Sequence, residues 1–249
     1  MNSSYNLVLS GGGVRGYAHI GILKALFEQK LNIHAISGTS AGSMIGAFIC
    51  DGFSPEEIEE IILKHEPKIS FNYLGIKESI LSFNSVAELL RKNLRSQSFE
   101  KLKIPLFVSV TNLNTGLHEI INSGNLMDAI TASSAIPVVF PPAVINNIPY
   151  ADGGLSSNLP VEPFLDGELK IIGSHVNPIG TWGENGLMKS IDRTLHLLMR
   201  SNIAGSIRKC DIFIEPPALT RFHLFESKKA KEIIAVGYDY VKETTSIKI

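Results

Sequence analysis

The sequence predicts an α/β protein with a mainly parallel central sheet that helices cover on both faces. Short apolar segments alternate along the chain with segments of helical spacing, which is the order of elements that a parallel sheet requires. The first apolar segment, Leu7–Leu9, is continuous rather than alternating, as expected of a strand buried on both faces. The 249 residues are 44% hydrophobic and even in composition, so we expect a single domain over residues 1–249.

Two strand–helix units are predicted at the start of the chain. The apolar runs at 5–9 and 33–37 are the expected strands, and a glycine-containing turn follows each of them. Helical spacing of apolar residues predicts a helix over 17–30, and the apolar run after the second turn predicts another over 40–50. A serine N-cap, a proline and a glutamate at 54–57 then predict the start of a third helix.

The rest of the chain predicts further strands and helices, apart from residues 66–84, which show no clear period. A second capping box at 85–88 predicts a helix through Leu94, and Pro137 is expected to end a helix that begins at Leu126. Residues 104–111 and 117–121 are expected to form a hairpin of two strands, and two short strands are expected on either side of Asn146-Asn147. The remaining expected strands are 169–174 and 210–214. The other expected helices are 187–204 and 228–243.

Composition and charge exclude several classes of protein. The formal net charge is −1 and no basic stripe is present, so we expect no nucleic-acid partner. Cys50 and Cys210 lie far apart, without metal-ligand or redox spacing, which fits a reducing cytoplasm. The polar start of the chain, 1–4, does not indicate a signal peptide. The uncharged stretch 31–50 is broken by glycines into strand, turn and helix, so no transmembrane segment is expected.

A candidate nucleophile, Ser40, lies in the motif Gly38-Thr39-Ser40-Ala41-Gly42. The motif stands between an apolar strand and an apolar helix, which is the setting of a nucleophile elbow. Its flanking glycines, Gly38 and Gly42, would let the chain turn sharply and expose the serine hydroxyl. The alternative is a tight turn without chemistry, which this placement disfavours.

A serine nucleophile needs a base, and histidine is the usual one. In an α/β-hydrolase the catalytic residues occur in the chain order serine, acid, histidine. His175, His196 or His223 could formally be the histidine in that order. That fold places several strands before its nucleophile, whereas only two strands and one helix fit before Ser40. None of the seven histidines lies in a distinctive glycine-rich loop.

Asp152 is the better candidate for the base. It ends a short predicted strand and is followed by Gly153 and Gly154, so the backbone can turn tightly and direct the carboxylate into a cleft. A carboxylate within about 3 Å of a serine hydroxyl, shielded from water, can accept its proton. From the turn alone, an ordinary Asp-Gly turn on the surface is an equally good interpretation.

The glycine run Gly11-Gly12-Gly13-Val14-Arg15-Gly16 follows the first strand and has two interpretations. It matches a dinucleotide fingerprint, but the second strand lacks the acidic residue that would hold a ribose, and no Lys-Ser/Thr pair indicates a phosphate-binding loop. It also suits an oxyanion hole, because parallel strands would bring it beside Ser40. The candidate donors are the amides of Gly11, Gly12, Gly13 and Ala41. Arg15 either supports the loop or favours an anionic substrate group.

These three motifs, in this order, closely resemble the patatin-like phospholipase family. The segments Ala132-Ser133-Ser134-Ala135-Ile136-Pro137, Phe140-Pro141-Pro142 and Asn158-Leu159-Pro160 also resemble that family, so the likeness spans residues 5 to about 160. The resemblance implies a three-layer α/β/α fold and a Ser40–Asp152 dyad without a catalytic histidine. It also implies a glycine-loop oxyanion hole and no metal or other cofactor.

The substrate implied by the resemblance is a fatty-acyl ester or phospholipid, with transient contact at a lipid surface. Residues 66–84, with Phe71, Tyr73 and Phe83, and the turn 140–142 are candidates for the walls of an acyl trough or a lid, or they are ordinary loop packing. Two other functions stay open: a serine hydrolase of soluble esters or thioesters, and a regulatory protein of the same fold with little turnover.

Overall fold

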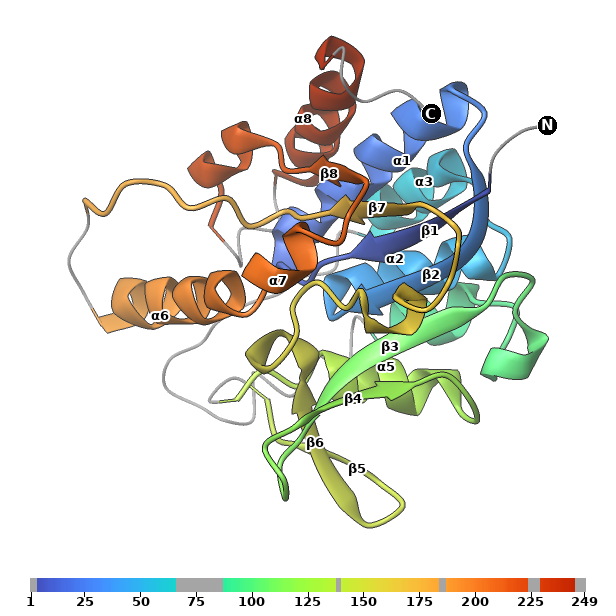
Figure 1. The fold of residues 1–249 in the computed structure, drawn as a ribbon, viewed down its shortest axis with the longest axis vertical. Coiled ribbons are helices and arrows are strands. Elements are labelled where there is room, and N and C mark those ends of the chain that lie inside the picture. The colour runs from blue at the N-terminus through green and yellow to red at the C-terminus, as the bar shows by residue number, and fades with distance from the viewer. Residues whose placement is uncertain (1–3, 66–86, 138–139, 184–186, 224–228, 245–249) are drawn as a thin grey trace.

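The computed structural model describes residues 4–65, 87–137, 140–183, 187–223 and 229–244 (Figure 1). The strands are β1 Ser4–Leu9, β2 Asn32–Thr39, β3 Leu106–Asn112, β4 His118–Ile121, β5 Ala143–Ile145, β6 Ile148–Asp152, β7 Ile171–Ser174 and β8 Ile212–Ile214. The α-helices are α1 Ala18–Glu28, α2 Ala41–Cys50, α3 Pro55–His65, α5 Leu126–Ser133, α6 Leu187–Ser201, α7 Ala204–Ile207 and α8 Ala230–Glu243, and residues 87–93 are also helical.

The sheet is mixed, with most of its strands parallel. Five strands run in parallel in the order β3-β2-β1-β7-β8, and β4, β5 and β6 pair antiparallel at the β3 end. The predicted fold class, an α/β protein with a mainly parallel sheet between helices, is therefore confirmed. The antiparallel part comes from the two hairpins that the turn residues predict, and both Asn146 and Asn147 have the positive φ that such a tight turn needs.

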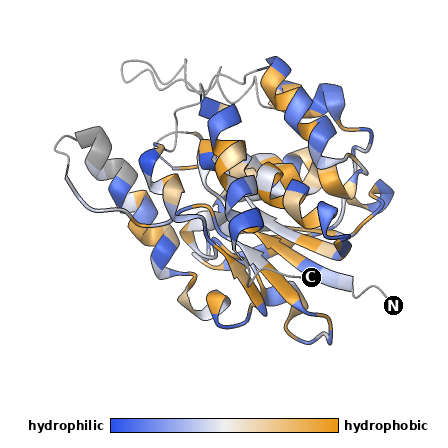
Figure 2. Cartoon of the chain, turned by 90° about the horizontal axis from the view of Figure 1, so that it is seen from above, coloured by the Kyte–Doolittle hydropathy of each residue, from blue (hydrophilic) through white to orange (hydrophobic). Residues whose placement is uncertain are grey.

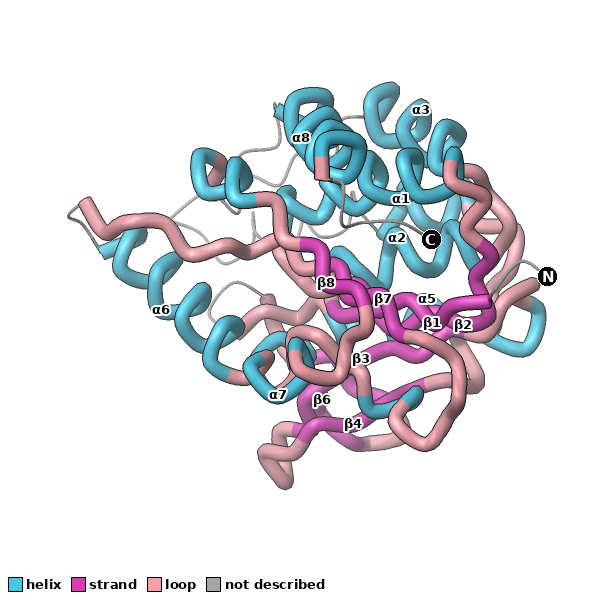
Figure 3. The backbone as a smooth tube through the Cα atoms, turned by 45° about the horizontal axis from the view of Figure 1, so that its top comes forward, coloured by secondary structure: helices cyan, strands magenta, loops and turns pink. Residues whose placement is uncertain are grey.

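Helices flank both faces of the sheet, and each face has its own core. Figure 3 shows α1, α3 and α8 on one side of the strands and α7 on the other. In β1, Leu7 and Leu9 belong to the larger core with α1, α2 and α8, whereas Val8 faces a smaller core with Phe164 and Ile203. Figure 2 shows the apolar strands between helices that are hydrophilic on their outer faces. The continuous apolar strand is explained by this burial on both sides.

The start of α3 follows the predicted capping chemistry. Before α3, the Glu57 amide donates to Ser54 Oγ at 3.2 Å, and the Ser54 amide donates to Glu57 Oε2 at 2.7 Å, which confirms the capping box. The second box, at 85–88, lies partly outside the described residues, and residues 66–84 lie wholly outside them.

Two predicted helices have wrong boundaries. The helix expected to reach Pro137 ends at Ser133, because Ile136 before a proline disfavours helical backbone and the Ala135 carbonyl instead accepts the Asp152 amide at 3.0 Å. The single helix expected over 187–204 is divided into α6 and α7 around Asn202, whose side chain bonds to backbone of the 154–158 segment.

Candidate active site

Ser40 forms the sharp turn between β2 and α2. Its backbone has φ 49° and ψ −119°, a conformation that a non-glycine residue adopts only under strain. The Ser40 amide donates to Ser133 Oγ at 2.8 Å, and Ser133 Oγ donates to the Ser109 carbonyl at 2.7 Å. The strained turn is thus held by α5 and β3 as well as by its own strand and helix.

The glycines around Ser40 are required by close backbone contacts. A methyl group at Gly38 would lie 2.7 Å from the backbone of Gly42 and Ser43. One at Gly42 would collide with the Leu9 carbonyl and lie 2.6 Å from the Ser10 carbonyl. The turn packs directly against β1, so a side chain at either glycine would force backbone atoms apart.

The glycine loop lies beside the Ser40 turn, as the parallel strands predict. Leu9 pairs with Gly38, so the residues that follow β1 and β2 share one edge of the sheet. Gly13 has φ 54°, and a methyl group at Gly16 would collide with the Ala41 side chain. Packing against the elbow therefore explains why glycines recur in this loop.

The amides proposed as oxyanion donors are not equally available. The Gly11 amide donates to Asn158 Oδ1 at 3.1 Å, so this N–H is already used inside the protein. The amides of Gly12, Gly13 and Ala41 make no hydrogen bond to any residue in the described part of the chain. The available donors are therefore these three amides.

Arg15 is buried beneath the loop and bonds to the protein itself. Its Nε and Nη2 donate to the Phe222 carbonyl at 2.8 and 2.5 Å, and Nη1 lies 2.9 Å from His196 Nε2. Of the two interpretations of Arg15, these contacts favour loop support over binding of an anionic substrate group.

His19 and His175 are buried and bond to other parts of the protein. His19 Nε2 contacts the Ser10 carbonyl and Nδ1 contacts Ser174 Oγ, both at 2.9 Å. Burial lowers the pKa of His19 to about 4, so this ring stays neutral and holds the start of the glycine loop. His175 Nδ1 lies 2.7 Å from Glu215. All seven histidines lie in the described ranges, and none of them hydrogen-bonds Ser40.

Asp152 ends β6 and is 1% exposed. Its Oδ1 accepts the Gly154 amide at 2.7 Å, and its carbonyl accepts Thr111 Oγ1 at 2.9 Å. A methyl group at Gly153 would collide with Ser109, so this turn also needs a glycine. The surface-turn interpretation of Asp152 is wrong, because the residue is buried at the end of β6.

Burial raises the pKa of Asp152 to about 6, while the Gly154 amide and the Ser40 hydroxyl lower it in part. The Ser40 hydroxyl therefore interacts with this carboxyl. Within the described residues, however, Oδ2 has no hydrogen-bond partner of good geometry. One carboxyl oxygen is thus held by the turn and the other is left available.

Strand β3 explains how two loops distant in sequence meet. Strand β4 occupies one side of β3, opposite both Ser109 and Val110. The other side is shared: β2 ends with Thr39 opposite Ser109, and β6 ends with Asp152 opposite Val110. Because Ser109 and Val110 are consecutive, the two strands meet end to end. Ser40, the residue after β2, is therefore brought to Asp152.

The raised pKa of Asp152 predicts a stability cost at neutral pH. The proton is held more tightly in the folded state than in the unfolded state, so stability falls as pH rises from about 4 to about 6 and stays lower above that range. The difference corresponds to about 3 kcal/mol. Asp152→Asn cannot ionise, so at about pH 8 it is expected to be more stable than wild type by up to this amount, and near pH 4 by nothing. Urea denaturation at both pH values checks this; equal stability at the higher pH would contradict it.

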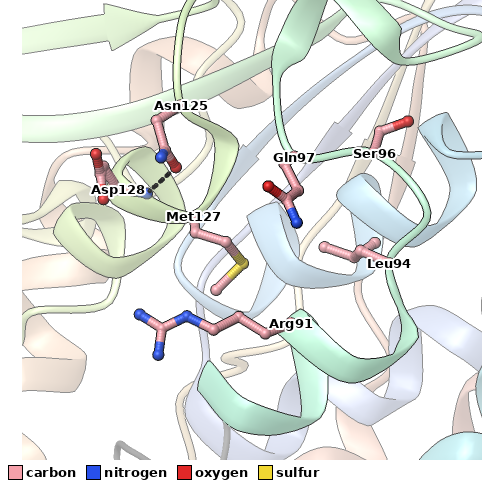
Figure 4. A pocket seen from close by; sticks show the side chains of 7 residues that line it. All are labelled: Arg91, Leu94, Ser96, Gln97, Asn125, Met127 and Asp128. Carbon is pink, nitrogen blue, oxygen red and sulfur yellow. Dashed lines mark hydrogen bonds between the residues drawn. The ribbon is translucent and has the colours of Figure 1, made fainter.

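A separate cavity of about 230 Å³ lies between the end of the helix over 87–93 and the start of α5 (Figure 4). It is lined by Arg91, Leu94, Ser96, Gln97, Asn125, Met127 and Asp128. Ser133, which bonds to the elbow, lies five residues beyond the lining residue Asp128 along α5, about 8 Å of helix. The cavity is not part of the Ser40–Asp152 site.

Several supporting residues could not be recognised from the sequence as such. Ser133 and Asn158 fall in segments that resemble the family, but their bonds to the Ser40 and Gly11 amides connect positions 93 and 147 residues apart.

In the described residues, no group of three or more His, Cys, Asp or Glu side chains is arranged to hold a metal ion. Among the same residues, none of the helices has the length and apolar character needed to span a bilayer.

The fold and the site define a class: α/β proteins with a strained serine elbow at the carboxyl edge of a mostly parallel sheet. The family model described as "Patatin-like phospholipase" matches residues 7–165. The chain belongs to this family.

Two relatives and one solved structure are similar to this chain. The chain is 27% identical over 268 residues to Lysophospholipase NTE1 of Kluyveromyces lactis, which covers 94% of the chain and 18% of that protein. It is 33% identical over 165 residues to an uncharacterized NTE family protein of Mycobacterium bovis, with coverage of 63% and 44%. The chain thus spans less than half the length of either relative. The crystal structure of VipD from Legionella pneumophila matches with a TM-score of 0.59 at 18% identity, covering 96% of this chain and 66% of that one, which shows a shared fold.

Proposed function

We propose that the protein is a serine lipid acyl hydrolase, of the phospholipase A or lysophospholipase type, that works through a Ser40–Asp152 dyad. One observation carries this proposal: a buried carboxyl with a raised pKa and one unpaired oxygen interacts with a serine held in a strained turn. A lipid ester is favoured as the substrate by membership of the patatin-like phospholipase family. The name of the NTE1 relative, a lysophospholipase, supports the same substrate class.

The first half of the reaction transfers the acyl group to the enzyme. The Asp152 carboxylate accepts the Ser40 proton while Ser40 Oγ attacks the acyl carbonyl carbon. The resulting oxyanion is bound by the amides of Gly12, Gly13 and Ala41. When the tetrahedral intermediate collapses, the bond to the leaving alcohol breaks, and Asp152 returns the proton to that alcohol. The acyl group is left as an ester on Ser40.

The second half repeats these roles with water as the nucleophile. Asp152 accepts a proton from water, the hydroxide attacks the acyl-enzyme, and the same amides bind the second oxyanion. Collapse releases the fatty acid and returns the proton to Ser40. A pKa of about 6 leaves the carboxylate largely ionised at neutral pH and more basic than an ordinary aspartate.

Two segments are candidates for the walls of an acyl trough, and only one of them is described. The candidate walls at 66–84 are not among the described residues. In the other candidate segment, Phe140 is half-buried, and both Pro141 and Pro142 are exposed. This segment precedes Asp152 in the chain by 10 to 12 residues. We propose transient contact with a lipid surface, because a membrane-resident substrate must be reached there.

The substrate class is tested by incubating the protein with phospholipid vesicles, lysophospholipid micelles and short-chain p-nitrophenyl esters, with products identified by mass spectrometry. Ser40→Ala is the inactive control, and Ser37→Ala is its match, because Ser37 is a buried serine whose Oγ has no partner in the described structure. We expect fatty-acid release from lipids by wild type and Ser37→Ala, and none by Ser40→Ala. Hydrolysis of short esters alone would indicate a soluble-ester hydrolase. No turnover of any substrate would indicate a regulatory protein of the same fold.

A further inference from the structure

Asn158 joins the two loops of the site and has no part in the chemistry described so far. It is fully buried, six residues after Asp152, and its Oδ1 accepts the Gly11 amide at 3.1 Å. Its own backbone amide donates to Asn202 Oδ1 at 3.0 Å. Asn202 Nδ2 in turn donates to the Gly154 carbonyl at 2.8 Å. A chain of three hydrogen bonds thus runs from the glycine loop to the Asp152 turn.

The Asn158 carboxamide oxygen lies close to a glycine beside the nucleophile and to a glycine beside the acid. A methyl group at Gly11 would lie 2.8 Å from Asn158 Oδ1 and 3.2 Å from Ser40 Cβ. A methyl group at Gly154 would lie 3.0 Å from Asp152 Oδ1 and 3.2 Å from Asn158 Oδ1. The same carboxamide oxygen therefore borders the two glycines that flank Ser40 and Asp152.

The carboxamide is not explained by packing alone. Asn158 Nδ2 is buried and has no hydrogen-bond partner in the described residues. A buried donor left unpaired costs about 1–3 kcal/mol, so asparagine is a costly residue here unless its oxygen is needed by the Gly11 amide. The side chain also binds the Gly11 N–H, whereas the amides of Gly12 and Gly13 have no hydrogen bond within the described residues.

We propose that Asn158, held in place by Asn202, is a positioning residue that fixes the oxyanion donors relative to the Ser40–Asp152 pair. This inference rests on the proposed hydrolase function. Its effect is on the geometry of the transition state, where a displacement of about 1 Å costs roughly a hundredfold in rate. Substrate binding in the ground state does not depend on the same alignment, so kcat is affected more than KM.

Asn158→Ala is expected to lower kcat by about 30- to 100-fold and to change KM by less than about threefold. Rates are expressed per active site titrated with a fluorophosphonate, so that a smaller folded fraction does not count as lost activity. The matched control is Asn6→Ala, because Asn6 is a buried asparagine on β1 whose Oδ1 is also unpaired in the described structure. The control is expected to keep the wild-type kcat.

Asn158→Asp gives a second readout, which tests whether the side chain at this position lies beside the acid. It keeps an acceptor for the Gly11 amide but places a carboxyl group next to Asp152. The pKa of Asp152 is raised by burial and lowered by the Gly154 amide and Ser40, and no charged side chain contributes. A neighbouring carboxylate disfavours ionisation of Asp152, so the acidic limb of kcat/KM should move up by about one pH unit. In Asn158→Ala the limb should stay where it is in wild type.

The outcomes separate this inference from the proposed function. If wild type neither hydrolyses esters nor reacts with the fluorophosphonate, the proposed function fails. If wild type is active but Asn158→Ala keeps kcat within about threefold, or Asn158→Asp leaves the acidic limb unmoved, the positioning role is wrong. If Asn158→Ala does not fold, Asn202→Ala replaces it, because loss of that support should lower kcat with KM unchanged. An unchanged kcat in Asn202→Ala would then overturn the inference.

Discussion

Asp152→Asn is expected to lower kcat/KM for ester hydrolysis by about 10³-fold or more. The amide keeps the shape of the carboxyl group and can still accept the Gly154 amide through its oxygen. It cannot accept a proton from Ser40, so only the weak nucleophilicity of an unassisted hydroxyl is left. Steady-state kinetics on a medium-chain p-nitrophenyl ester measures this loss.

The pH dependence identifies the residue that titrates. Because the pKa of Asp152 is raised to about 6, wild-type kcat/KM should fall below that pH as the base becomes protonated. The residual activity of Asp152→Asn should show no such limb. The control is Asp51→Asn, since Asp51 is also a buried aspartate, bonded to the amides of Arg95 and Ser96. A limb near the same pH that persists in Asp152→Asn would assign it to another group.

Gly42→Ala is expected to destabilise the fold by more than about 3 kcal/mol. A methyl group at Gly42 would collide with the carbonyls of Leu9 and Ser10, and backbone atoms of β1 cannot move aside as a side chain can. The change should lower the urea midpoint strongly or leave no soluble protein. This is the largest stability effect that we expect from any single methyl group in the elbow.

Gly46→Ala is the matched control in the same helix. Its added methyl group would meet only side chains, Ile36 Cγ2 at 3.1 Å and Leu106 Cδ1 at 3.2 Å, which can shift slightly. Alanine also favours the helix over glycine by about 1 kcal/mol, which offsets the tight contacts. Stability within about 1 kcal/mol of wild type is expected. Equal losses in the two variants would show that the elbow is not specially constrained by β1.

The elbow and the glycine loop could be placed from the sequence because their requirements are local. A buried strand, a glycine-containing turn and an apolar helix follow one another within residues 4–28 in the first unit and within residues 32–50 in the second. Parallel pairing of the first two strands then brings the two turns together, as the pairing of Leu9 with Gly38 shows. The chemical roles of Ser40, Asp152 and the loop amides stay predictions.

The meeting of Ser40 and Asp152 could not be derived from local patterns. It depends on β2 and β6 sharing one side of β3, with their ends at consecutive residues of that strand. Strand pairings between distant segments leave no periodic signal in the sequence. At the level of the sequence, only the resemblance to the patatin-like phospholipase family implies this contact.

The same non-local contacts account for the wrong helix boundaries. The carbonyl of Ala135 is used by the Asp152 amide, and the side chain of Asn202 is used by the 154–158 segment. The helical periodicity of the sequence continues past Ser133 and past Ser201, so it predicts helices that are longer than α5 and α6. The chain departs from regular helix where it supports the Asp152 turn.

The pH dependence of fluorophosphonate labelling, followed by intact mass and mapped to the modified residue, tests the Ser40–Asp152 dyad most directly. Labelling requires an activated serine but no correct lipid substrate. We predict a single adduct on Ser40 in wild type, formed at a rate that rises through about pH 6, and labelling of Asp152→Asn that is about 10³-fold slower without that rise. An adduct on another residue, or labelling of Asp152→Asn at the wild-type rate, would contradict the dyad.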